Sequence, residues 1–153
     1  MTASTLLLTI TTGFFIFVIG QSFLKLVIEP AQELKKSIGL VSSTLLFHQA
    51  MIANAKANQE IAEAIRFCSA DIVSKSYVVL GYKVIQHLFR LPSKSNILLA
   101  AQELNLIAYG MVSGYAHSST SITSGESPDR GIYNLASINN IRKLLNIRTS
   151  YSH

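Results

Sequence analysis

The hydrophobic pattern of the chain changes abruptly at Lys25. The first 24 residues contain no charged side chain, whereas all 13 Lys and Arg and all 8 Asp and Glu lie at or after Lys25. Within the uncharged part, Leu6 to Leu24 reads LLLTITTGFFIFVIGQSFL. This is close to the ~20 apolar residues that cross a hydrocarbon core of about 30 Å as an α-helix. We therefore predict one transmembrane helix over residues 1–28.

A cleaved signal peptide is the competing interpretation of this segment. It would have a basic start, a shorter apolar core and a small-residue cleavage site, but nothing basic precedes Leu6. Lys25, Lys35 and Lys36 follow the span closely, and an excess of Lys and Arg marks the cytoplasmic side of a membrane segment. We expect a single-pass protein with its N-terminus outside and its remaining residues in the cytoplasm.

After the span, apolar residues recur with a helical period. A heptad-like seam continues beyond the membrane, formed by Leu34, Ile38, Val41, Leu45, His48 and Ile52. Because the residue before proline is disfavoured in the α region, Glu29-Pro30 predicts a kink or a short break before this seam, and a hinge. The residues 54–58 (NAKAN) predict a turn at the other end of the seam.

Three further helices are predicted from the same periodicity. The first contains Ile61 to Ile72, and the second begins at about Tyr77 and carries Leu80, Val84, Leu88 and Phe89 on its apolar face. The third carries Ile97 to Ala108 and ends at Gly110 to Gly114. The expected fold is all-α, divided into the span (1–28), a cytoplasmic helical domain (29–113), a flexible Ser-rich loop (114–131) and a C-terminal amphipathic helix (132–148).

No motif of an enzyme or a metal site is present in the sequence. GxSxG, P-loop, HExxH, CxxC and GxGxxG patterns are all missing. Cys68 is the only cysteine, and the four histidines lack metal-ligand spacing. Glu60 and Glu63 lie near Lys56 and Arg66, which is typical of a solvated helix face. We expect a protein without catalytic residues, metal or cofactor.

Two groups of polar residues are candidates for function. Thr5, Thr9 and Thr12 share one face of the span, where small and hydroxyl residues favour helix packing or, in an oligomer, line a pore; the residues alone favour packing. Lys83, His87 and Arg90 share another helix face, with Lys94 just beyond. Such a face is ordinarily solvated or faces headgroups, but four copies would form a basic ring for an anionic ligand such as an oligonucleotide.

The residues 17–21 (FVIGQ), Lys25 and the residues 28–39 (IEPAQELKKSIG) resemble the signature of a family of small bacterial single-pass membrane proteins. That family includes HalB, the membrane effector of the Hailong antiphage system. Residues 91–93 (LPS), Asn105 and the residues 141–147 (IRKLLNI) extend the resemblance over nearly the whole chain. The pattern departs at Asn146, where glycine is expected.

The resemblance implies a homotetrameric ion channel that depolarises the bacterial inner membrane in antiphage defence. Its regulator would be a deoxyadenylate oligomer, made by a nucleotidyltransferase-like partner enzyme, that holds the channel inactive. On this hypothesis the pore and its cytoplasmic mouth contain Thr5, Thr9, Thr12, Gly20, Gln21 and Lys25. The ligand site contains Lys83, His87, Arg90 and Lys94. The alternative is a membrane-anchored helical interaction module that conducts nothing, in which the span only tethers or dimerises the chain.

Overall fold

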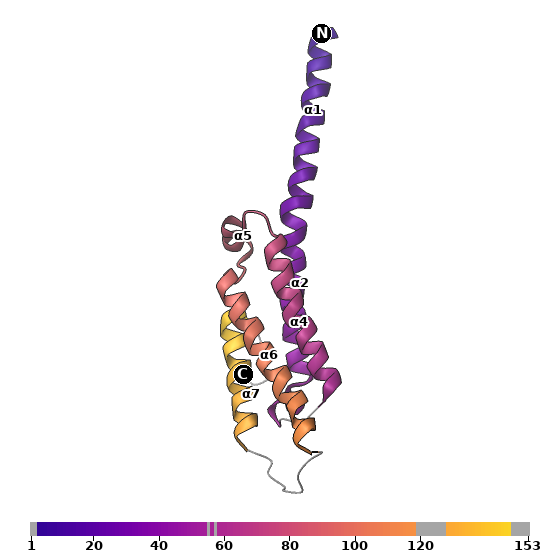
Figure 1. Cartoon of the computed structure of the whole chain (residues 1–153). Helices are drawn as coiled ribbons and strands as arrows, with labels where there is room; N and C mark the ends of the chain where they lie inside the picture. Colours follow the sequence, from indigo (N-terminus) through magenta and orange to yellow (C-terminus); the bar gives the residue numbers. More distant parts are fainter. Residues whose placement is uncertain (1–2, 55, 57, 119–127, 148–153) are drawn as a thin grey trace.

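A computed structural model of the chain describes residues 3–54, 56, 58–118 and 128–147. All regular secondary structure in this part is helical, which confirms the all-α prediction (Figure 1). The elements are α1 (Ala3–Phe23), the π-helical segment η1 (Leu24–Ile28), α2 (Glu29–Phe47), α3 (Gln49–Ala53), α4 (Gln59–Val78), α5 (Tyr82–Phe89), α6 (Lys94–Ser118) and α7 (Pro128–Leu145).

The first three elements form one continuous helix of 45 residues, Ala3–Phe47, about 68 Å long at 1.5 Å per residue. Figure 1 shows its first half projecting from the rest of the molecule as a rod. The prediction of a short break at Pro30 is wrong, because the helix continues through this residue. The disturbance instead takes the form of the π-helical turn before the proline, in which the Glu29 N–H donates to the Leu24 carbonyl. Such wide turns are a common way for a helix to absorb a local misfit.

The rod carries no buried side chain. Every described side chain from Ala3 to Leu26 is exposed, although most of them are apolar. A helix that is hydrophobic on all sides is stable in the core of a large protein or in a bilayer, and this one is long and apolar enough to span a membrane.

The other helices form an elongated bundle in which α2, α4, α6 and α7 alternate in direction (Figure 1). Neighbouring pairs in this order pack on each other, and α7 also packs on α3. The seam predicted on α2 is buried here, except for His48, which is half-buried. Its large members have partners within the same chain, including Ile65, Ile72, Leu104 and Ile141. The seam is therefore part of the core of the protomer.

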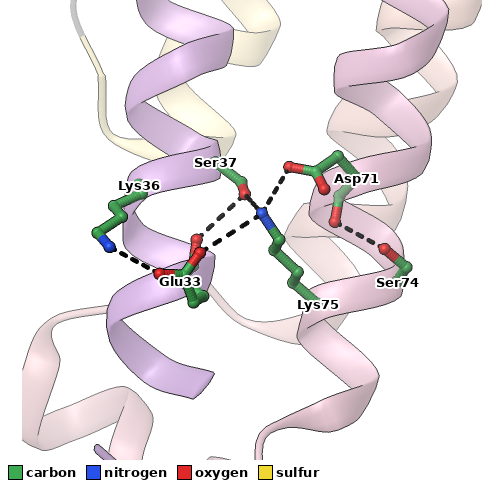
Figure 2. Close-up of polar contacts among 6 residues, drawn as sticks. All are labelled: Glu33, Lys36, Ser37, Asp71, Ser74 and Lys75. Atoms are coloured by element: carbon green, nitrogen blue, oxygen red, sulfur yellow. Dashed lines mark hydrogen bonds and ion pairs between the residues drawn. The ribbon is translucent and has the colours of Figure 1, made fainter. Parts of the chain in front are cut away.

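A polar cluster fixes α2 against α4 (Figure 2). The Lys75 ammonium donates to the Ser37 hydroxyl (2.7 Å), pairs with Asp71 (3.0 Å) and lies 3.9 Å from Glu33. Burial alone would raise the pKa of Asp71, but Ser37 and Lys75 outweigh it and lower that pKa. We call these four residues the Lys75 cluster. The Lys75 cluster holds the last turn of α4 beside the first turns of α2, close to the point where the rod joins the bundle.

The predicted second cytoplasmic helix differs from the structure. α4 runs on to Val78 and the new helix begins at Tyr82, because Val79 is extended and Gly81 is left-handed (φ 63°). A left-handed residue is the usual place for glycine and ends a helical register. The predicted apolar face is wrong for three of its four residues, since Leu80, Val84 and Leu88 are exposed. Phe89 is half-buried and packs against the core, where Tyr82 and Ile85 are buried.

Both ends of the predicted loop 114–131 are helical. α6 does not end at Gly110 to Gly114 but continues to Ser118, and α7 begins at Pro128, where a missing N–H costs nothing. The residues 119–127 lie outside the described part, as does residue 148 of the predicted C-terminal helix. α7 is held on α3 by the Asn134 side chain, which donates to the Ile52 carbonyl (2.8 Å).

Asn146 ends α7 in a specific backbone geometry. This residue is left-handed (φ 54°), and the next N–H, of Ile147, donates back to the Arg142 carbonyl (3.2 Å). These features form a Schellman cap, in which glycine is preferred and asparagine is the next choice. Asn146 thus adopts the left-handed backbone geometry for which glycine is ordinarily preferred.

Candidate membrane and ligand surfaces

Thr9, Thr11 and Thr12 of α1 direct their hydroxyl hydrogens to their own helix. Thr9 donates to the Thr5 carbonyl and Thr12 to the Leu8 carbonyl, both at 2.8 Å, and Thr11 on another face does the same to Leu7 at 2.9 Å. With the hydrogen engaged, each side chain offers its methyl group and oxygen lone pairs outward. That chemistry suits close helix packing and also contact with a cation.

The six proposed pore residues do not share one face. At 3.6 residues per turn, Thr5, Thr9 and Thr12 fall within about 60° of one another and Gly20 lies at the edge of that sector. Gln21 is about 160° from Thr5 by the same geometry, and Lys25 follows it by about one turn. A straight helix in a ring therefore turns either the threonine face or the Gln21 face toward the axis.

Lys25 marks where the rod meets the bundle. It is exposed within η1, whereas Val27, two residues later, is half-buried and packs against the core. Lys side chains at the end of a span reach the water and headgroup region while their methylene groups stay in apolar surroundings. This position suits a boundary of the membrane.

The basic residues cluster on and beside α5. Lys83 and His87 are exposed one turn apart, with His87 Nδ1 2.9 Å from the Lys83 carbonyl. Lys94, at the start of α6, is half-buried and lies over the rings of Tyr77 (5.2 Å) and Tyr82 (5.1 Å). Burial raises the pKa of Tyr82 to about 12, so this phenol is neutral and donates to the Pro92 carbonyl. The four predicted residues thus lie around one small helix.

Arg90 has a backbone role that the sequence did not indicate. It is left-handed (φ 53°), and the Leu91 N–H donates to the Gln86 carbonyl (2.9 Å), which closes α5 in a Schellman cap. A substitution at Arg90 therefore changes both charge and backbone strain. Lys83 and His87 are the better positions for testing charge.

Sequence reasoning found the apolar residues near the basic ones but did not predict that three of them are exposed. We define the apolar strip as Leu80, Val84 and Leu88, whose exposed fractions are 57%, 73% and 69%. Tyr77 and Val78, at the end of α4, are exposed next to it in the sequence. The spacing of these residues in the sequence predicted a shared apolar face. Spacing does not indicate whether the core, solvent or another molecule covers such a face.

A second exposed surface lies between α4 and α6. An open groove there is lined by Arg66, Gln102, Asn105, Leu106 and Tyr109, and Leu106 and Tyr109 are largely exposed. We call it the α6 groove. Aromatic, Leu and Arg side chains in such a setting are typical of protein interfaces.

Within the described part of the chain, no three His, Cys, Asp or Glu side chains come together in a way that could hold a metal ion. Cys68 is buried, its thiol lies 3.6 Å from the Thr44 hydroxyl, and burial raises the pKa of the thiol. It is a packing residue of α4. Comparisons of the chain with protein-family models, with curated proteins and with solved structures give no match.

Proposed function

We propose that the chain is an oligomeric membrane effector whose N-terminal helices form an ion channel that depolarises the bacterial inner membrane in antiphage defence. Four copies would surround the pore, with N-termini outside and bundles in the cytoplasm. An anionic ligand, a nucleotide or deoxyadenylate oligomer made by a nucleotidyltransferase-like partner, would regulate it. The family resemblance of residues 17–39 supports this proposal, and so does the geometry of the long helix.

The continuity of Ala3–Phe47 is the observation that carries the proposal. Its α2 half is fixed in the bundle by buried residues such as Leu34 and Val41 and by the Lys75 cluster. A change in bundle orientation is therefore transmitted to the span, with η1 and Pro30 as the most deformable point. A ligand that binds one bundle arrangement more tightly would shift the population of open channels.

The oligomeric state is the first test of the pore. Light scattering in mild detergent, with and without a short deoxyadenylate oligomer, should give a tetramer that binds the oligomer, and bilayer recordings should then show conductance. Since a single helix cannot enclose an aqueous path, a monomer that conducts nothing would end the channel proposal.

The helix faces provide a sharper test. If the threonine face lines the pore, Thr9→Phe reduces single-channel conductance several-fold, whereas Thr11→Phe, on another face with the same type of hydrogen bond, leaves it unchanged. Gln21→Phe is also neutral in that arrangement. Sensitivity at Gln21 with indifference at Thr9 would assign the opposite face to the axis.

The ligand site is tested by Lys83→Glu and His87→Glu, with Lys143→Glu on α7 as the control. We expect weaker binding of a deoxyadenylate oligomer and a salt dependence whose slope falls by about 0.7 for each phosphate that the variant no longer neutralises. Binding that is equal in all three variants would remove α5 from the ligand site.

The exposed α6 groove favours a second candidate, a membrane-anchored interaction module that recruits a protein partner and conducts nothing. Leu106→Asp separates the two. Loss of the oligomer in detergent makes the groove a subunit contact of the channel. A wild-type chain that is monomeric or dimeric and carries no ion flux in vesicles supports the interaction module.

A further inference from the structure

The apolar strip is exposed on a helix whose orientation is fixed. On the opposite side of α5, Tyr82 and Ile85 are buried in the core, so the helix cannot turn Val84 and Leu88 inward. Val84 and Leu88 are two large aliphatic side chains one turn apart on α5, and Leu80, which is also exposed, precedes the helix by two residues. An exposed apolar surface of this kind ordinarily marks a contact with a membrane or another molecule.

The strip lies at the membrane end of the bundle. Lys75 contacts Ser37 at 2.7 Å, so α4 ends beside the first turns of α2, and α5 begins only a few residues later. Toward the N-terminus, Val27 is the last residue of the long helix that packs on the core. Figure 1 shows α5 at about the same level along the long axis of the molecule as the point where the rod leaves the bundle. The strip is thus close to the level at which the apolar span begins.

Charge on α5 is complementary to a membrane surface. Lys83 and His87 lie on the sector next to Val84 and Leu88, about 100° away around the helix, and Arg90 follows at its end. Helices that lie in a membrane surface combine an apolar face with Lys and Arg beside it, and the cytoplasmic leaflet is anionic. Tyr77, three residues before Leu80 in the sequence, is exposed, and tyrosine is enriched at membrane interfaces.

We propose that α5 is an interfacial helix whose apolar strip inserts into the cytoplasmic leaflet of the membrane that α1 spans, with Lys83 and His87 at the level of the lipid phosphates. The bundle is then attached to the bilayer at two points, the span and α5, which fixes its tilt. This proposal goes beyond the proposed channel. It needs the span alone and no conductance. Because Lys83 and His87 then face lipid phosphates, an anionic nucleotide ligand would compete with lipid for these two side chains.

The chain contains no tryptophan, which allows single-tryptophan variants of the full-length protein. Val84→Trp and Leu88→Trp report on α5, and Phe17→Trp reports on the span. Phe67→Trp is the matched control, because Phe67 is 64% exposed on α4 but lies about 16 Å along the helix from Val78. Each variant is reconstituted in phosphatidylcholine and phosphatidylglycerol vesicles whose acyl chains carry bromine.

We expect quenching by brominated lipid at positions 84, 88 and 17 to exceed that at position 67 several-fold. At 84 and 88, bromine near the headgroup end of the acyl chain quenches more than bromine near the methyl end, since an interfacial helix lies about 5–10 Å into the boundary region. A nitroxide attached to Val84→Cys repeats the test without tryptophan, which itself prefers membrane interfaces. The measured quantity is the accessibility of the nitroxide to oxygen, which enters the bilayer, compared with its accessibility to a water-soluble nickel chelate.

Quenching at 84 and 88 that is no greater than at 67, while position 17 is quenched, overturns the proposal. Blue-shifted emission at 84 and 88 without lipid quenching also overturns it, because the strip is then covered by a second copy of the chain. A protein that is monomeric and carries no current still gives the expected quenching, so this result is independent of the channel.

Discussion

The two halves of the Ala3–Phe47 helix place similar apolar residues in different environments. In α1 every described side chain is exposed, and the apolar residues surround the helix. In α2 most of the apolar residues form one stripe that is buried by α4 and the rest of the core, and Leu40 and Phe47 are exposed. Burial within the chain stabilises α2, whereas no described side chain of α1 is buried by the rest of the chain. An apolar helix of this kind is stabilised by lipid or by other copies. The same type of substitution should therefore affect unfolding of the bundle in α2 and membrane insertion in α1.

The largest expected difference is between two leucines of this helix. Leu34→Ala removes a side chain that is 0% exposed and should lower the free energy of unfolding by about 2–5 kcal/mol. Leu8→Ala changes a side chain of the rod that is 68% exposed and should leave unfolding of the bundle unchanged. Urea denaturation of the full chain in detergent measures both. Equal losses of stability would mean that the rod packs against the bundle.

A charge gives the reverse result. Ile16→Lys places an ammonium near the middle of the span. It should make the free energy of membrane insertion less favourable by about 2.5–3.5 kcal/mol. Leu40→Lys, at a partly exposed position of α2, should insert normally. The fraction of chain that resists alkaline extraction from membranes measures the difference. An Ile16→Lys protein that stays fully inserted would show that this position faces water or protein in the assembly.

The same contrast explains which parts of the fold were predictable from the sequence. The span follows from composition alone, and the α2 seam and α6 follow from a period that needs no knowledge of their partners. The turn at Gly81 was missed because the helical spacing of Leu80, Val84 and Leu88 runs across it. Leu80 precedes the left-handed Gly81 and lies outside α5, and the core accepts Tyr82 and Ile85 instead of Val84 and Leu88.

The candidate sites were predictable only as lists of residues. Spacing placed Lys83, His87 and Arg90 on one helix, yet it could not show that Arg90 is a left-handed cap, because its residue type carries no signal for that geometry. The contact of Lys94 with Tyr77 and Tyr82 joins α4, α5 and α6, and such contacts depend on the packing of distant segments. Contacts between subunits depend on the surfaces of several copies, so they are even harder to predict from the pattern of one chain.

Two glycines provide a smaller test of packing against exposure. A Cβ atom at Gly131 would lie 2.5 Å from the Ala53 carbonyl oxygen, so Gly131→Ala must displace α7 from α3 and should cost about 1–3 kcal/mol of stability. Gly39, on the exposed face of α2, has nothing within 4 Å of such an atom. Gly39→Ala should therefore stabilise the helix by about 0.5–1 kcal/mol.

Thermal unfolding of both variants in detergent decides this point. If Gly39→Ala destabilises the oligomer while the isolated protomer gains stability, that face of α2 is a contact between subunits. If Gly131→Ala has no effect, α7 does not approach α3 as closely as the structure shows.

The smallest expected effect is the pH dependence of the Lys75 cluster, which ties α2, and with it the span, to α4. The pKa of Asp71 is lowered from its ordinary value of 3.8 in the folded chain. The carboxylate thus contributes stability that is fully present above that value and is lost as pH falls through the folded pKa. Because the pair with Lys75 is partly exposed, we expect a contribution below about 1 kcal/mol.

Urea midpoints between about pH 7 and about pH 3 test this contribution. Asp71→Asn should be less stable than the wild type at neutral pH, and the two curves should converge in acid, where the wild-type carboxyl is also uncharged. Glu60→Gln, at an exposed position of the first turn of α4, should follow the wild-type curve. Curves for Asp71→Asn and the wild type that stay parallel down to low pH would show that the cluster holds α2 by packing of Ser37 and the Lys75 methylene groups, because the charge of Asp71 would then contribute nothing.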